Sequence, residues 1–200
     1  MELMDAIYHR RAVRSYTDRA VEPATVMELL RAAVQAPSGP NQQPWEFGVF
    51  QGRKRLEDFS ERAKHYLLQS LPPFFEACPE IETYAEHTHD IFHGAGTLIV
   101  IYAVDSRNHN AQDCCLAAQN LMLAAHGLGL GTCPIAHARR WLNLPEVKIE
   151  LGIAQDLIAV FSVVVGYTAV KPPDPPRREP EVVSWFRPDQ RAGGQTMLRR

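Results

Sequence analysis

The chain is 200 residues long, with 46% hydrophobic residues, 22% charged residues and a formal net charge of −2. This composition is typical of a folded protein of about one domain, and the near-neutral charge argues against nucleic acid or an anionic membrane as a general partner. No apolar run reaches the length of a membrane span, and the acidic opening, Met1 to Asp5, is typical of a helix start rather than a signal peptide. We therefore expect a cytoplasmic protein without a membrane partner.

The first half of the chain predicts three helices and one strand. Apolar residues at helical spacing indicate helices over residues 2–10, 22–34 and 53–69, the second with a proline in its first turn. Residues 45–50 read as a strand. The polar, irregular stretch over residues 79–93 predicts an exposed excursion or a lid.

The second half begins with the clearest buried strand, over residues 97–104. A helix over 113–127 is apolar nearly all round, which favours burial on several faces, for example at a subunit interface. Gly127 is predicted to take the left-handed position that ends it. Two short helices, 139–144 and 145–151, and a buried strand over 157–165 follow. The proline-rich segment 172–180 should run extended over a surface.

Alternating strands and helices could indicate a parallel dinucleotide-binding sheet, but the glycine pattern argues against it. Gly94-Ala95-Gly96 precedes its strand, whereas the dinucleotide fingerprint follows one and has a third glycine.

Cysteine and histidine spacing predicts no metal site. The four cysteines, Cys78, Cys114, Cys115 and Cys133, show no CxxC pair and read as reduced thiols. His87, His89 and His93 do not fall on one helical face, although Asp90 lies among them. No Ser/His/Asp or Cys/His pattern indicates a nucleophile, so we predict no catalytic side chain.

Two N-terminal motifs carry candidate binding chemistry. Arg10, Arg11 and Arg14 lie within five residues, and guanidinium groups match phosphate in geometry and charge; the same residues also fit solvated charges at a helix end. The loop over 36–45 is rich in proline and in small hydrogen-bonding side chains. The side-chain amides of this loop could form hydrogen bonds with the edge of a planar heterocycle or with the loop's own backbone.

Together with residues 129–135, 165–167 and 176–180 downstream, these motifs resemble the nitroreductase family of FMN flavoproteins. The resemblance covers about residues 1–186. It implies an α+β fold in which a central, mostly antiparallel sheet is wrapped by helices, in an interlocked homodimer with FMN at the subunit interface. We expect one domain over 1–186 and a C-terminal tail over 187–200 that is disordered or clasps the partner.

The resemblance also implies which residues bind FMN. Arg10 and Arg14 would hold the phosphate and ribityl chain, with Ala12 where the family commonly has serine. Arg11 would reach the pyrimidine edge or solvent, the Ala136 N–H would point at flavin N5, and Arg178, in preference to Arg177, would supply the late basic residue. The full predicted set is Arg10, Arg11, Ala12, Arg14, Pro37, Ser38, Gly39, Asn41, Gln43, Pro134, Ile135, Ala136 and Arg178.

The implied activity is a ping-pong oxidoreductase. NADH or NADPH would pass hydride to flavin N5, and an electron-poor acceptor such as a nitroaromatic or a quinone would then take it. Two alternatives remain open: other chemistry on the same fold (reductive dehalogenation, flavin-consuming or dehydrogenase activity), or a flavin-binding carrier or sensor without turnover. The sequence does not determine which acceptor is reduced, or whether NADH or NADPH is the electron donor.

Overall fold

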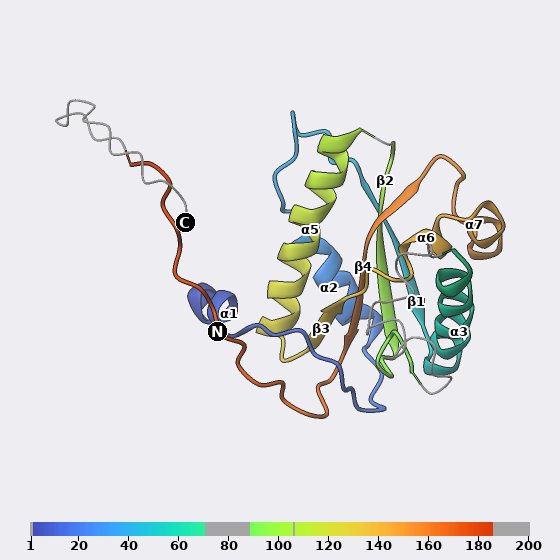
Figure 1. The fold of residues 1–200 in the computed structure, drawn as a ribbon, viewed down its shortest axis with the longest axis horizontal. Helices are drawn as coiled ribbons and strands as arrows, with labels where there is room; N and C mark the ends of the chain where they lie inside the picture. Colours follow the sequence, from blue (N-terminus) through green and yellow to red (C-terminus); the bar gives the residue numbers. More distant parts are fainter. Residues whose placement is uncertain (1, 71–88, 106, 186–200) are drawn as a thin grey trace.

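The computed structural model describes residues 2–70, 89–105 and 107–185. Cys78, His87, most of the predicted 79–93 excursion and the 187–200 tail lie outside the described residues. Figure 1 shows helices on both sides of a central sheet. The helices are α1 (Leu3–His9), α2 (Pro23–Ala33), α3 (Arg53–Ser70), α5 (Asn108–Gly127), α6 (Arg139–Leu142) and α7 (Pro145–Leu151). The strands are β1 (Trp45–Gln51), β2 (Thr97–Ala103), β3 (Gly131–Pro134) and β4 (Ile158–Gly166).

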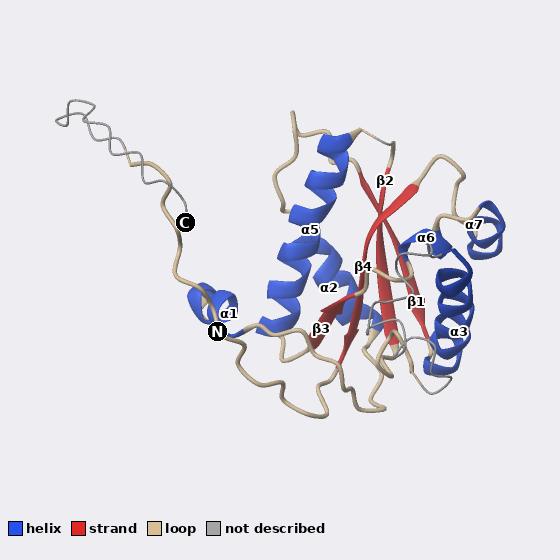
Figure 2. Cartoon of the chain, viewed as in Figure 1, coloured by secondary structure: helices blue, strands red, loops and turns tan. Residues whose placement is uncertain are grey.

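The strands form one antiparallel sheet in the order β1-β2-β4-β3 (Figure 2). All seven residues of β2 are buried, because helices cover both of its faces. Ile99 and Ile101 belong to the core under α2 and α5, whereas Leu98 and Val100 belong to the core under α3 and α6. This alternation is the two-residue period of a strand. The predicted α+β fold with an antiparallel sheet is confirmed.

The N-terminal segment after α1 lies between β3 and the chain that leaves β4. The Val13 N–H donates to the Thr132 carbonyl at 2.9 Å. On its other side the Thr17 N–H donates to Tyr167 O, and the Ala169 N–H to Ser15 O, both at 2.9 Å. Segments 12–17 and 167–169, distant in sequence, thereby extend the β3 edge of the sheet.

Most predicted elements are confirmed, with three differences. The helix expected over 113–127 begins at Asn108. Gly127 is still helical, and the left-handed residue is Gly129 (φ 76°), because the Leu128 N–H still reaches the Ala124 carbonyl. Strand β3 was not predicted, since its four residues show no alternation and end in Pro134.

Beyond β4 the chain leaves the sheet and runs extended past α1 (Figure 1). Residues 172–180 contain no helix or strand, as predicted. Asp174 in this segment binds Arg11, with Nη2 and Oδ1 2.7 Å apart. Large apolar side chains stay exposed on both segments, Leu3 and Tyr8 on α1 and Val183 near the end of the described chain. Within the described ranges no helix is long and apolar enough to cross a membrane.

Candidate functional site

Arg10, which is partly buried, lines a cavity of about 470 Å³ at the C-terminal end of α5. His9, His126, Thr132 and Lys171 also line this cavity. The Arg10 Nη1 atom is buried and has no hydrogen-bond partner among the described residues. Burial lowers the pKa of Arg10, and the positive charges of Arg177 and Arg11 lower it further. A buried, unpaired cation among other cationic groups is complementary to an anion.

Arg11 differs from Arg10 because its side chain is engaged within the chain. Its Nε donates to Asp174 Oδ1 at 2.9 Å, and its Nη1 donates to the Tyr8 and Arg10 carbonyls. The guanidinium thus ties α1 to the extended C-terminal segment, a contact that neither expectation for Arg11 included.

Arg14 and Ala12 lie beside β3. Ala12 forms a parallel bridge with Thr132. Arg14 follows Ala12 by two residues, and in an extended segment residues at that spacing lie on the same side. Arg14 is exposed, and its positive charge helps burial to lower the pKa of His93. His137, on the loop after β3, also acts on His93. Arg14 therefore lies near the β3–α6 loop.

That loop holds its backbone rigidly at the predicted flavin contact. The Ile135 N–H donates to Ser162 O at 2.9 Å, and Ser162 Oγ donates to Ile135 O at 2.5 Å. The next N–H, that of Ala136, donates to no group in the part of the chain that the structure describes. Because the bridge between Ala12 and Thr132 is parallel, Arg14 lies toward the Pro134 end of β3, next to residues 134–136. Arg10 lies at the other end of β3, where Gly129 and Leu130 line its cavity.

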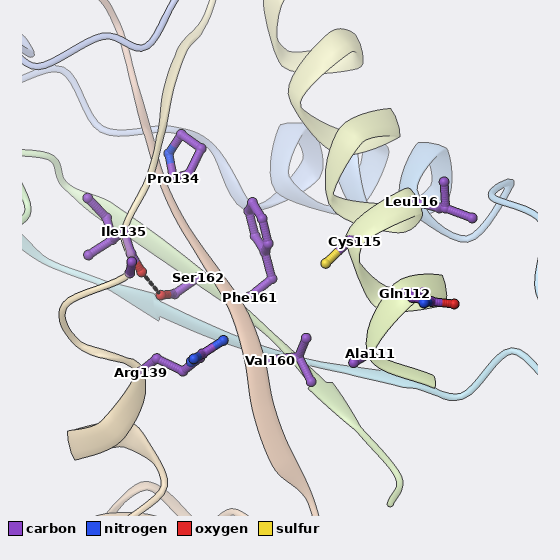
Figure 3. Close-up of a pocket in the computed structure, with 11 residues that line it drawn as sticks. Ala111, Gln112, Cys115, Leu116, Pro134, Ile135, Arg139, Val160, Phe161 and Ser162 are labelled. Atoms are coloured by element: carbon purple, nitrogen blue, oxygen red, sulfur yellow. Dashed lines mark hydrogen bonds between the residues drawn. The ribbon is translucent and has the colours of Figure 1, made fainter. Parts of the chain in front are cut away.

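A second cavity, of about 600 Å³, lies between α5, β4 and residues 134–136 (Figure 3). Its walls are largely apolar, with Leu116, Val160 and Phe161 among them. Arg139 at the start of α6 adds a positive charge to this apolar surface.

The Ser38 loop is organised by its own hydrogen bonds. Ser38 Oγ accepts the Gln43 N–H at 2.9 Å, and Ser38 O accepts the Asn41 N–H at 2.7 Å. Asn41 and Gln43 have φ angles of 62° and 50°, in the left-handed region that is costly for residues with a side chain. The loop is held in a strained shape, with Pro37, Asn41 and Gln43 exposed.

One chain does not bring this loop to Arg10. The Gly39 N–H donates to Asp113 in the second turn of α5, whereas the Arg10 cavity includes His126 in its last turn. Thirteen helical residues separate these anchors by about 20 Å. The Ser38 loop and Arg10 therefore lie at opposite ends of α5. Residues 134–136 line the second cavity together with Ala111 and Gln112, near the N-terminal end of that helix.

Of the two late arginines, Arg177 is the one whose charge acts on Arg10. Arg178 is exposed, and its role stays a prediction. Sequence reasoning did not select His126, Lys171 or Arg139. His126 and Lys171 come from the end of a helix and from an extended tail, and they join Arg10 only because segment 12–17 lies between β3 and 167–169.

The fold and the site define an α+β protein with a cationic cavity beside its sheet. The family model described as "Nitroreductase family" matches residues 7–167. A nitroreductase from Bacteroides fragilis, solved with bound FMN, is 25% identical, with a TM-score of 0.74 and full coverage of both chains. The chain belongs to the nitroreductase family, and the predicted family is confirmed.

Two curated relatives have defined activities. A nitrobenzene nitroreductase from Ectopseudomonas oleovorans is 28% identical over 196 residues, covering 82% of this chain and 85% of the relative. An FMN reductase [NAD(P)H] from Bacillus subtilis is 27% identical over 188 residues, covering 92% of this chain and 72% of the relative.

Proposed function

We propose that this protein is an FMN-dependent oxidoreductase that takes electrons from NADH or NADPH and passes them to an electron-poor small molecule such as a nitroaromatic or a quinone. The observation that carries this proposal is the buried Nη1 of Arg10, which has no partner among the described residues, at a cationic cavity beside the turn between α5 and β3. The FMN named for the Bacteroides relative and the activities of the two curated relatives support it.

The residues present fit FMN. Arg10 offers an unsatisfied, charged donor where a phosphate would find a complementary cation, and Arg14 adds a second charge along the same edge. The Ala136 N–H is a free backbone donor on a loop that the Ile135–Ser162 hydrogen bonds fix. A fixed donor of this kind stabilises negative charge on a neighbouring ring without reorganisation.

When bound, FMN supplies the hydride-accepting and hydride-donating chemistry. The protein's own part is binding, orientation and exclusion of water. Arg10 and Arg14 bind and orient, the Ala136 N–H donates, and the apolar wall formed by Leu116 and Phe161 limits access of water. This division of work needs no titrating side chain, in line with the absence of a predicted nucleophile.

We further propose a homodimer in which each FMN lies between two subunits. Asp113, which holds the Ser38 loop, and His126, beside Arg10, lie about 20 Å apart along α5 in one chain. A second copy that supplies the loop would bring both groups to one site. The exposed apolar side chains of α1 and of the C-terminal segment are available surface for such an interface. In this arrangement residues 1–186 act as one domain.

The test is an absorbance spectrum of the purified protein, followed by anaerobic NADH, then NADPH, then a nitroaromatic acceptor. We expect oxidised-flavin bands that a nicotinamide bleaches and the acceptor restores. Bands that neither nicotinamide bleaches would contradict the reductase activity and favour the carrier or sensor alternative. Bleaching without reoxidation by nitroaromatics or quinones would favour other chemistry on the same fold.

A further inference from the structure

Arg139 projects a guanidinium into the apolar cavity between α5 and β4. Figure 3 shows its side chain pointing from the start of α6 toward β4. Leu116, Val160 and Phe161 form apolar walls, and Arg139 is the one charged side chain among the described residues that line the cavity. Arg139 is exposed, so its charge lies at the mouth of the cavity, where a bound anion can reach it.

Several arginines bind a carboxylate, and among the described residues Arg139 has none. Arg11, Arg62 and Arg107 each bind a carboxylate. In the described ranges the Arg139 guanidinium has no ion pair or hydrogen bond. Only its backbone is anchored: its N–H donates to Ala136 O at 3.2 Å, and its carbonyl accepts from Asn143 at 2.9 Å.

The charge of Arg139 reaches across the cavity to α5. Burial raises the pKa of the Cys115 thiol, and the positive charge of Arg139 opposes that rise. Ala111 and Gln112, near the N-terminal end of α5, lie on the same wall, and the helix dipole makes that end partly positive. No carboxylate is among the described lining residues.

We propose that this cavity takes a planar aromatic acceptor that carries a carboxylate, and that Arg139 binds the carboxylate. The inference rests on the proposed function and narrows its substrate class. The apolar walls accept the ring, and residues 134–136 place the cavity against the predicted FMN site. Guanidinium and carboxylate form two parallel hydrogen bonds, which strengthen where apolar walls reduce competition from water.

The experiment measures the dissociation constant of benzoate, an aromatic acid that the enzyme cannot reduce, for the FMN-loaded protein. Binding is followed by perturbation of the flavin spectrum. We expect Arg139→Gln to weaken benzoate binding by about tenfold or more and Arg139→Lys to weaken it less. The binding of neutral benzamide should change little with either substitution. Arg140→Gln is the matched control, because Arg140 is exposed on the same helix and does not line the cavity.

Four results would overturn this inference while leaving the proposed function intact. Benzoate affinity could be the same in Arg139→Gln and Arg140→Gln, or benzamide could weaken as much as benzoate. Alternatively, Arg139→Gln could lose FMN, or change only the KM for NADPH, which would assign the guanidinium to a phosphate or to the flavin. A wild-type protein that takes up no FMN would instead overturn the proposed function, and this inference with it.

Discussion

Gly131 holds three segments of the site edge together, and replacing it with alanine should separate them. A Cβ at Gly131 would lie 2.6 Å from Thr168 Oγ1 and 2.7 Å from Val13 Cγ2, well inside ordinary contact distance. Val13 cannot easily yield, because its N–H is bonded to Thr132 and its carbonyl accepts the Tyr16 hydroxyl at 2.7 Å. The segment that carries Arg10 and Arg14 would therefore move away from β3.

Overpacking of this kind costs about 1–3 kcal/mol. For a chain of this size, each kcal/mol corresponds to a change in Tm of about 2–4 °C. Gly131→Ala should therefore lower the Tm of the FMN-free protein, measured by circular dichroism. It should also weaken FMN binding, measured by fluorescence titration, because the arginines would shift relative to the Ala136 N–H.

Gly127→Ala is the matched control. Gly127 is the last residue of α5, has an ordinary backbone conformation, and a Cβ there would meet nothing within 4 Å. Alanine in a helix is favoured over glycine by about 0.5–1 kcal/mol, so this variant should be neutral or slightly stabilised. If Gly131→Ala were as stable as Gly127→Ala and bound FMN equally well, the packing of 12–17 against β3 would be wrong.

Three further predictions concern charged groups. Arg10→Met should raise the stability of the FMN-free protein by about 1 kcal/mol, because it removes a partly buried, unpaired charge, and should weaken FMN binding by at least about tenfold. Denaturant unfolding measures the first effect and fluorescence titration the second. A loss of stability would show that Arg10 has a partner in the free protein. Arg62 binds Glu150 through two hydrogen bonds, of 2.8 and 2.5 Å, which join α3 to α7, and a double-mutant cycle should give a coupling of about 0.5–1 kcal/mol because both side chains are partly exposed. The Arg62 hydrogen bonds lower the pKa of Glu150, so this coupling should be present above the ordinary glutamate pKa of about 4.3 and lost as the pH falls through the lower folded value; a coupling that is unchanged in acid would contradict the pairing. Burial and the charge of Arg14 lower the pKa of His93, so the unfolded state binds a proton first and stability should fall as the pH drops below about 6.5. His93→Asn should flatten that pH dependence, and asparagine also tolerates the left-handed φ of 58° at this position. An unchanged slope would refute the assignment.

Helical spacing and proline positions were sufficient to predict most of the fold. Residues 145–151 form a helix with the predicted limits because Pro145 opens it and Gly152 ends it in a left-handed conformation. Strand β3 could not be predicted in this way, since its four residues become a strand only by pairing with β4. A local pattern does not contain that information.

The site was predicted in part, for a similar reason. The arginine run indicated anion binding, but spacing does not say that Arg10 enters a cavity while Arg11 binds Asp174. Arg139 and Arg140 are adjacent and both exposed, and the sequence does not indicate that only Arg139 lines a cavity. The distance between the Ser38 loop and Arg10 depends on the length and direction of α5 within the fold.

The central claim is that one FMN site needs the Arg10 edge of one subunit and the Ser38 loop of another. The most direct measurement is the FMN content of a mixed dimer of two defective chains, purified by two different affinity tags. One chain carries Arg10→Met. The other carries Gly39→Phe, which its own fold should accept because a Cβ at Gly39 meets nothing within 4 Å, but which would fill the space in front of the loop.

Each variant alone should retain no FMN, measured by absorbance after gel filtration. In the mixed dimer both changes fall in one site, and the other site is intact, so we predict one FMN per dimer, reducible by a nicotinamide. A mixed dimer that holds no FMN would mean that each chain completes its own site, and it would contradict the proposed arrangement.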